Sequence, residues 1–160
     1  MDVTVAHIGI SRDDFLTHLG TSELISEGEL SALRNDTSLD TMQLSEKLLT
    51  TGLLTPFQIE SLIAGRPQDL RVGNYDILSK LGQGGMGTVY KARHRRMKRL
   101  VALKVLSAKL CEDASFVARF QREVETIARL GHPNIVMAYD ADEAEIGIPS
   151  LEDTSRIKSE

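Results

Sequence analysis

The stretch Leu81–Val89 constrains the fold most strongly, because it places four glycines between two segments of strand-like sequence. Glycine takes positive φ without steric cost and lets backbone N–H groups come close to an anionic ligand. The stretch fits the pattern G-x-G-x-x-G-x-V, and we interpret it as a loop that covers phosphate groups. The segments on either side decide which kind of site this loop serves.

Three strand-like segments surround the glycines. Apolar and polar residues alternate over 75–81, and β-prone segments follow at 88–93 and 100–106. Alternation with a period of two is typical of strands, and short connections between strands favour an antiparallel arrangement. We therefore predict a three-stranded antiparallel meander with the glycines at the tip of its first hairpin.

Residues 11–65 have helical signals instead. Ser11 with Asp14 three residues later resembles a capping box, and we expect the helix that follows to end at Gly20. A clearer helix is predicted after the N-cap Thr55, since Pro56 suits the first helical position. This helix is expected to end at Gly65. The apolar residues on its inward face are Phe57, Ile59, Leu62 and Ile63.

A weak internal repeat lies between these two helices, because residues 24–31 resemble residues 48–55. Each copy is interpreted as a helix end, a glycine stop, an apolar residue and a hydroxyl cap. We therefore predict a small helical module over 11–65 that serves packing or docking and has no catalytic role. Residues 1–10 are expected to be unstructured, and the polar segment 66–71 is expected to be a linker.

Composition limits the compartment and the type of site. The 160 residues are 41% hydrophobic, which suffices for a modest core, and they include one cysteine, Cys111, so no internal disulfide can form. No signal peptide and no apolar span of about 20 residues is recognisable. We expect a cytoplasmic protein without a membrane partner. The four histidines are scattered, so no metal site is expected.

Charge is distributed unevenly along the chain. Residues 71–110 carry ten basic residues and one acidic residue, whereas residues 1–70 carry four basic and eleven acidic ones. The basic cluster at 93–99 could be a solvated turn or a surface for a polyanion. We favour the turn and expect no nucleic-acid partner, because no aromatic residues alternate with these charges as they do in proteins that bind single strands.

One lysine in the third predicted strand calls for an anion. Ala102 and Lys104 share one face of this strand, and a lysine within an apolar strand is either an edge residue reaching solvent or the partner of an anion. The next segment, 111–130, is predicted to be a helix with an apolar stripe through Phe116, Phe120, Ile127 and Leu130. Glu123 falls on this stripe, so it could meet Lys104 or pair locally with Arg119.

The order of these motifs resembles the N-terminal lobe of a bacterial serine/threonine protein kinase. The resemblance rests on Gly82, Gly84, Gly87 and Val89, on the segment 101–104, on Glu123 and on the segment 132–136, and it covers about 72–142. It implies an α+β fold in which an antiparallel sheet and one helix follow the helical module. The helical module is similar to modules that precede kinase domains in some environmental bacteria.

The resemblance also implies roles for individual residues. The glycines would cover the phosphates of ATP. The adenine ring would be contacted by Leu81, Val89 and Ala102, and Lys104 would hold the phosphates while paired with Glu123. The implied ligands are ATP and Mg²⁺, and other proteins are expected to dock on the helical module. The implied nucleotide-binding residues are Leu81, Gly82, Gln83, Gly84, Gly85, Met86, Gly87, Thr88, Val89, Ala102 and Lys104.

The sequence also departs from the kinase pattern. It contains neither an H-R-D-type catalytic loop nor a D-F-G-type metal motif, and residues 143–160 form a polar tail. We interpret the chain as a kinase domain truncated before its catalytic loop, inactive by itself and without magnesium ligands. An alternative is a non-catalytic interaction module built on a kinase lobe. A dinucleotide-binding fold is disfavoured, because its third glycine opens a helix whereas Gly87 precedes a β-prone segment.

Overall fold

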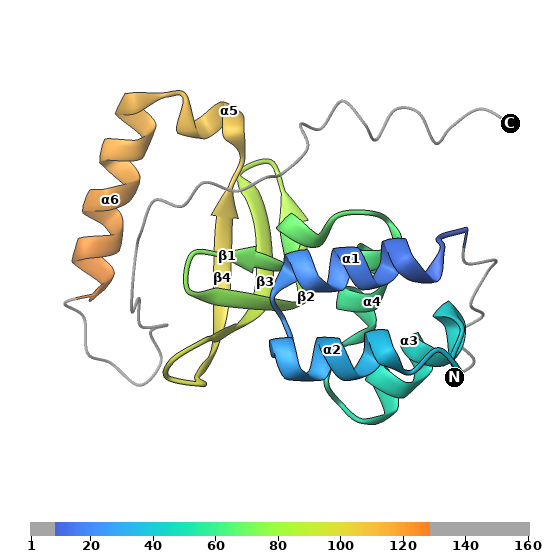
Figure 1. Cartoon of the computed structure of the whole chain (residues 1–160). Helices are drawn as coiled ribbons and strands as arrows, with labels where there is room; N and C mark the ends of the chain where they lie inside the picture. The colour runs from blue at the N-terminus through green and yellow to red at the C-terminus, as the bar shows by residue number, and fades with distance from the viewer. Residues whose placement is uncertain (1–8, 129–160) are drawn as a thin grey trace, which may run out of the picture.

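The computed structural model describes residues 9–128, which form a group of helices followed by a curled sheet and a long helix (Figure 1). Predictions for residues 1–8 and 129–160 lie outside the described residues. The helical group consists of α1 (Arg12–Ser22), α2 (Glu27–Asn35), α3 (Thr41–Thr50), α4 (Pro56–Ile63) and the 3-10 helix η1 (Pro67–Leu70). The remaining elements are β1 (Arg71–Val72), β2 (Tyr75–Gly84), β3 (Gly87–His94), β4 (Leu100–Leu106), α5 (Ala108–Cys111) and α6 (Ala114–Ala128).

Side-chain caps define where the first four helices begin. The predicted caps Ser11 and Thr55 are confirmed, since each accepts a hydrogen bond from the backbone N–H three residues later. Ser26 and Asp40 cap α2 and α3 in the same way. Each such cap satisfies a backbone donor that the first helical turn leaves unpaired. Sequence-local hydrogen bonds therefore fix where each of the four α-helices α1 to α4 begins.

Two glycines predicted to end helices do not do so. Helix α1 continues past Gly20 to Ser22, and its C-cap is Glu23 in the left-handed conformation at φ 49°. Gly28 lies within α2, because the capping box of Ser26 and Glu29 starts the helix at Glu27. The interpretation of 24–31 as a repeat of 48–55 is thus wrong for the first copy. The second copy has the predicted order, with Gly52 after α3 and Thr55 capping α4.

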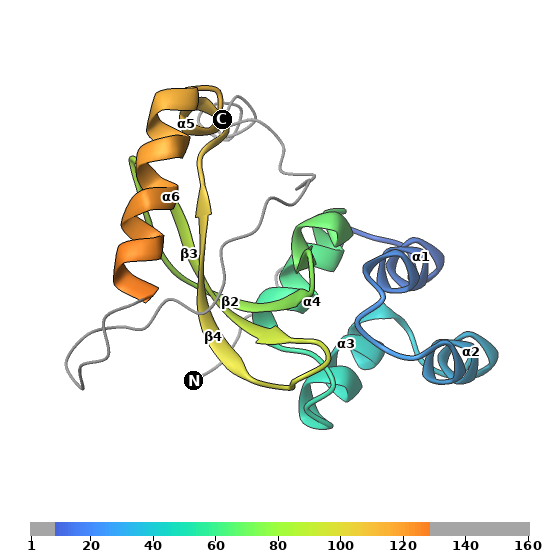
Figure 2. The same cartoon turned by 90° about the vertical axis from the view of Figure 1, so that its left-hand side faces the viewer.

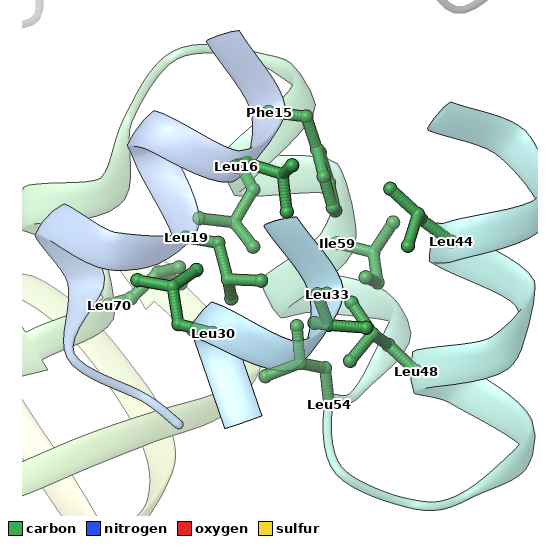
Figure 3. Packing of buried hydrophobic residues seen from close by; sticks show 11 residues of the cluster. Phe15, Leu16, Leu19, Leu30, Leu33, Leu44, Leu48, Leu54, Ile59 and Leu70 are labelled. Carbon is green, nitrogen blue, oxygen red and sulfur yellow. The ribbon is translucent and has the colours of Figure 1, made fainter. Parts of the chain in front are cut away.

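A leucine-rich core holds the helical group together (Figure 3). Phe15 and Leu19 of α1 are fully buried and contribute to one cluster with side chains of α2, α3 and α4. Leu70 belongs to the same cluster although it lies in the segment expected to be a linker. The other members of this cluster are Leu16, Leu30, Leu33, Leu44, Leu48, Leu54, Ile59 and Leu62.

The four strands form an antiparallel sheet in the order β1-β2-β3-β4. Strands β2, β3 and β4 confirm the predicted three-stranded meander, and β1, which was not predicted, pairs with β2. In β3 and β4 we call the side that carries Val89 and Lys104 the front face, because these two residues are directly paired. Side chains alternate across a strand, so Tyr90 and its paired residue Leu103 lie on the opposite, back face. Ala92, also on the back face, is fully buried.

Helices cover the two sides of this sheet differently. In both views α6 stands on one side of β3 and β4, and α1 to α4 lie on the other (Figures 1 and 2). The ring of Phe57 in α4 contacts the ring of Tyr90, with 6.1 Å between centroids, so α4 meets the back face. Between residues 9 and 128, no helix combines the length and apolar character required to cross a membrane.

Charged side chains also join the helical group to the sheet. Arg71 in β1 donates to a carboxylate oxygen of Glu23 at 2.5 Å, and the guanidinium of Arg95 lies 4.0 Å from the same oxygen. The hydrogen bond from Arg71 and the charges of both arginines hold the pKa of Glu23 below its ordinary value. Arg95 also lies 3.6 Å from Asp76 of β2. The C-terminal end of α1 is thus tied to the sheet and to its β3–β4 turn.

Candidate functional site

The glycine-rich stretch forms the tip of the β2–β3 hairpin. Gly84 pairs with Gly87, so the turn consists of Gly85 and Met86. A register shift between Lys80 and Gly82 leaves Leu81 out of the paired positions, and its side chain is exposed. The tip of the hairpin therefore exposes the backbone at its glycines, and Met86 is the large exposed side chain of the turn.

Gly87 is the position in this hairpin where the backbone requires glycine. Its φ is +139°, which disfavours any residue with a Cβ atom, and a Cβ built there would lie 2.0 Å from the carbonyl oxygen of Val105. The other three glycines, Gly82, Gly84 and Gly85, have open space at the corresponding position. Gly87 thus allows the close approach of β3 to β4, whereas the other three leave the hairpin open to a ligand.

An open hollow of about 360 Å³ lies between this hairpin and β4. Lys104 lines it from β4 and Val89 from β3, as their direct pairing places both side chains on the front face. The remaining lining residues are those of the hairpin tip: Gly82, Gln83, Gly84, Gly85, Met86 and Gly87. Eight of the eleven residues predicted to bind nucleotide are therefore brought together.

Three of those eleven residues do not line the hollow. Thr88 is next to Val89 in the strand, so its side chain lies on the back face. Ala102 is exposed on the front face, two residues before Lys104. Leu81 is exposed beside the hairpin. Ala102 and Leu81 are thus free of other side chains that would bury them, while Thr88 contributes to the strand pairing of the hairpin.

Lys104 is the cation of this hollow. Its side chain is exposed, and it has no ion-pair partner among the residues that the structure describes. Backbone N–H groups of a glycine-rich turn together with one ammonium group suit a phosphate ligand, because both donate hydrogen bonds and carry positive or partly positive charge. The arrangement can hold and orient an anion, but it offers no group that forms or breaks bonds.

Glu123 of α6 lies apart from Lys104. It is exposed and borders a second hollow with Arg119, Arg122 and Thr126, and within residues 9–128 no ion pair joins it to Lys104 or to Arg119. The guanidinium of Arg119 instead lies 5.5 Å from the ring centre of Phe116.

The apolar stripe of α6 includes Val124, which was not predicted to belong to it. Phe116, Phe120 and Val124 are half-buried, and the rings of Phe116 and Phe120 are stacked with 6.4 Å between centroids. Val117 and Ala118 are half-buried as well, whereas Glu123 is exposed, which differs from the prediction that Glu123 shares this face. The side chain of Ile127 and residue Leu130 lie outside what the structure describes.

None of the residues that line the hollow is a histidine, cysteine, aspartate or glutamate. From residue 9 to residue 128 there is no group of three or more histidine, cysteine, aspartate or glutamate side chains that could hold a metal ion. The residues around the hollow therefore do not fit a magnesium site, and we assign no step to Mg²⁺ there.

Comparison with known proteins gives the hairpin and β4 a family context. Residues 75–148 match the protein kinase domain family. The chain is 49% identical over 69 residues to the serine/threonine-protein kinase PknF of Mycobacterium tuberculosis. The aligned segment covers 43% of this chain and 14% of PknF. It is 51% identical over 71 residues to the serine/threonine-protein kinase PknB of Mycobacterium leprae, covering 44% of this chain and 11% of PknB.

A solved kinase structure is also similar to part of this chain. The kinase domain of Mycobacterium tuberculosis PknI is 38% identical, with a TM-score of 0.43, over 49% of this chain and 32% of that domain. The chain thus spans between one tenth and one seventh of the length of the two curated relatives.

Proposed function

We propose that the segment matching the protein kinase domain family, residues 75–148, binds ATP in the hollow beneath the glycine hairpin, as one half of the nucleotide site of a serine/threonine protein kinase. The observation that carries the proposal is the shared lining of one hollow by the hairpin tip, Val89 and Lys104. Protein kinases place these same parts around the phosphates of ATP.

Each part of the hollow has a proposed task. The backbone of the hairpin covers the phosphates, and Lys104 holds them as a point charge. Val89, with the exposed Leu81 and Ala102, provides apolar contact for the adenine ring. This division follows the chemistry of the ligand, because phosphates require donors and positive charge whereas a purine ring is bound mainly by apolar contact.

We further propose that Glu123 fixes Lys104 when α6 moves toward β4. Both side chains are exposed and neither has an ion-pair partner among the described residues, so a new pair would break no existing one. In protein kinases a lysine and a glutamate in these positions must pair before phosphate is transferred. Residues 11–65 are proposed as a helical module that other proteins contact, joined through 66–71 to the kinase segment 72–142.

Replacing Lys104 with methionine is expected to weaken binding of ATP by about ten- to a hundredfold, because a hydrogen bond to a charged group contributes about 1.5–3 kcal/mol. Isothermal titration of the purified chain with ATP measures the dissociation constant. Lys91→Met is the matched control, since Lys91 is also exposed on the front face but does not line the hollow. Equal weakening in both variants would contradict a specific role for Lys104.

The 160-residue chain is expected to show no transfer of phosphate to protein. Its sequence contains neither the H-R-D-type loop that supplies the catalytic base nor the D-F-G-type motif that binds magnesium. The assay combines the chain with labelled ATP, magnesium and a generic protein substrate. Incorporation of label that disappears in Lys104→Met would contradict this expectation, whereas label that persists in that variant would indicate a contaminating kinase.

A further inference from the structure

Strand β2 is irregular at the point where helix α4 meets it. The pairing with β3 steps from Ile77 opposite Ala92 to Ser79 opposite Lys91, so the register skips Leu78. A skipped residue in an antiparallel pair leaves backbone groups without their ladder partners and bends the strand. The direction of β2 beyond this step, and therefore the location of the glycine hairpin, depends on how the irregular step is held.

Two side chains of α4 satisfy carbonyl groups at this step. The hydroxyl of Thr55 donates to the carbonyl oxygen of Leu78 at 2.6 Å, and the amide nitrogen of Gln58 donates to that of Ile77 at 2.8 Å. Gln58 is only 2% exposed and Ile77 is fully buried, so water does not replace the amide readily. An unpaired buried carbonyl is costly, which makes Gln58 a strong constraint on β2.

The same two side chains also start α4. The amide oxygen of Gln58 accepts from the backbone N–H of Thr55, and the hydroxyl of Thr55 accepts from the backbone N–H of Gln58. The hydroxyl of Thr55 thus accepts from the helix and donates to the strand, and Gln58 does the same with its amide oxygen and amide nitrogen. The first turn of α4 and the irregular step of β2 are therefore fixed relative to each other.

A third contact reaches the strand that lines the hollow. The ring of Phe57 lies against the ring of Tyr90 on the back face, and Tyr90 is adjacent to Val89, which faces the hollow. Tyr90 is paired with Leu103, and Val89 is paired with Lys104. Helix α4 therefore supports the sheet directly behind the two side chains that line the hollow from β3 and β4.

We propose that Gln58, with Thr55 and Phe57, is a positioning residue that holds β2 at its irregular step and so keeps the glycine hairpin over the hollow; its effect on nucleotide binding rests on the function proposed above. The helical group is then a support of the phosphate-covering hairpin and acts on it through the back of the sheet. None of these three side chains lines the hollow.

Hydrogen–deuterium exchange of the full chain without nucleotide tests the support directly. In Gln58→Leu, amides of residues 75–94 are expected to exchange about tenfold faster than in the unmodified chain, because local opening becomes easier when a buried hydrogen bond is lost. Gln43→Leu is the matched control. Gln43 completes the same capping box in α3, but it is exposed, and its side chain is hydrogen-bonded to Asp40 alone among the residues that the structure describes.

The exchange pattern decides the proposal. Faster exchange in 75–94 with Gln58→Leu, and not with Gln43→Leu, supports it. Faster exchange confined to α4, or spread equally over α1 to α3, would overturn it, since the first indicates only a lost cap and the second a general loss of stability. Phe57→Leu provides a milder second variant, for which increased exchange is expected around Tyr90 in β3 and unchanged exchange there would overturn the proposed contact.

A nucleotide titration separates this inference from the proposed function. If the unmodified chain binds ATP, Gln58→Leu is expected to raise the dissociation constant about three- to tenfold while Gln43→Leu leaves it unchanged. If the unmodified chain does not bind ATP, the proposed function fails, and the exchange experiment still shows whether α4 holds the hairpin. Binding that is unaltered in Gln58→Leu despite faster exchange would overturn the link between the hairpin and the ligand.

Discussion

Replacing Gly87 with alanine is expected to lower the free energy of unfolding by about 2–4 kcal/mol. The new Cβ would lie 2.0 Å from the carbonyl oxygen of Val105 and 2.9 Å from the Cα of Leu106, so the backbones of β3 and β4 must separate. The φ of +139° adds conformational strain, because side chains with a Cβ rarely occupy that region. Both effects act where the hairpin joins β4.

Urea denaturation followed by circular dichroism measures this loss, with Gly85→Ala as the matched control. A Cβ at Gly85 meets nothing within 4 Å, and no positive φ applies there, so that variant is expected to change the free energy of unfolding by less than about 0.5 kcal/mol. If the two variants were equally stable, the close approach of β3 and β4 at Gly87 would not constrain the fold.

The second large effect is expected at Phe15, whose replacement by alanine should lower the free energy of unfolding by about 3–5 kcal/mol. Phe15 is fully buried and belongs to the cluster that joins α1 to α2, α3, α4 and η1. Removing its ring takes away apolar contacts and leaves a cavity that the surrounding leucines fill only in part.

The matched control for Phe15 is Met42→Ala in α3. The side chain of Met42 is 49% exposed, so its truncation is expected to cost less than about 0.5 kcal/mol. The same urea titration serves both variants. A loss at Phe15 no larger than the loss at Met42 would contradict the leucine-rich core as the main source of stability in the helical group.

Local signals in the sequence predicted strands β2, β3 and β4 and two of the helix starts, but not the short strand β1. The alternation of side chains along β4 predicted that Ala102 and Lys104 share one face of the strand, and both side chains are exposed on that face. Caps predicted the helices after Ser11 and Thr55, since a hydroxyl that accepts from the third backbone N–H is a sequence-local interaction. The same rule applied to Ser26 and Asp40 would have predicted α2 and α3, because a Glu or Gln follows each by three residues.

Other features depend on tertiary contacts that no local pattern encodes. Glu23 ends α1 in the left-handed conformation although glycine is the usual residue there, and its carboxylate is held by Arg71 far along the chain. Glu123 was assigned to the apolar stripe of α6 because spacings of three and four both fit a helix, but in the structure Val124 is half-buried and Glu123 is exposed. The support of β2 by Gln58 likewise links residues that are far apart in sequence.

The junction between η1 and β1 has a consequence for how copies of this chain can associate. Helix η1 ends at Leu70, whose side chain is fully buried in the helical core, and β1 begins at the next residue, Arg71. Exchange of an element between two copies needs a hinge segment that can open and reach the other copy. Within residues 9–128 no loop residue separates η1 from β1, so we expect each set of helices to pack against the sheet of its own chain.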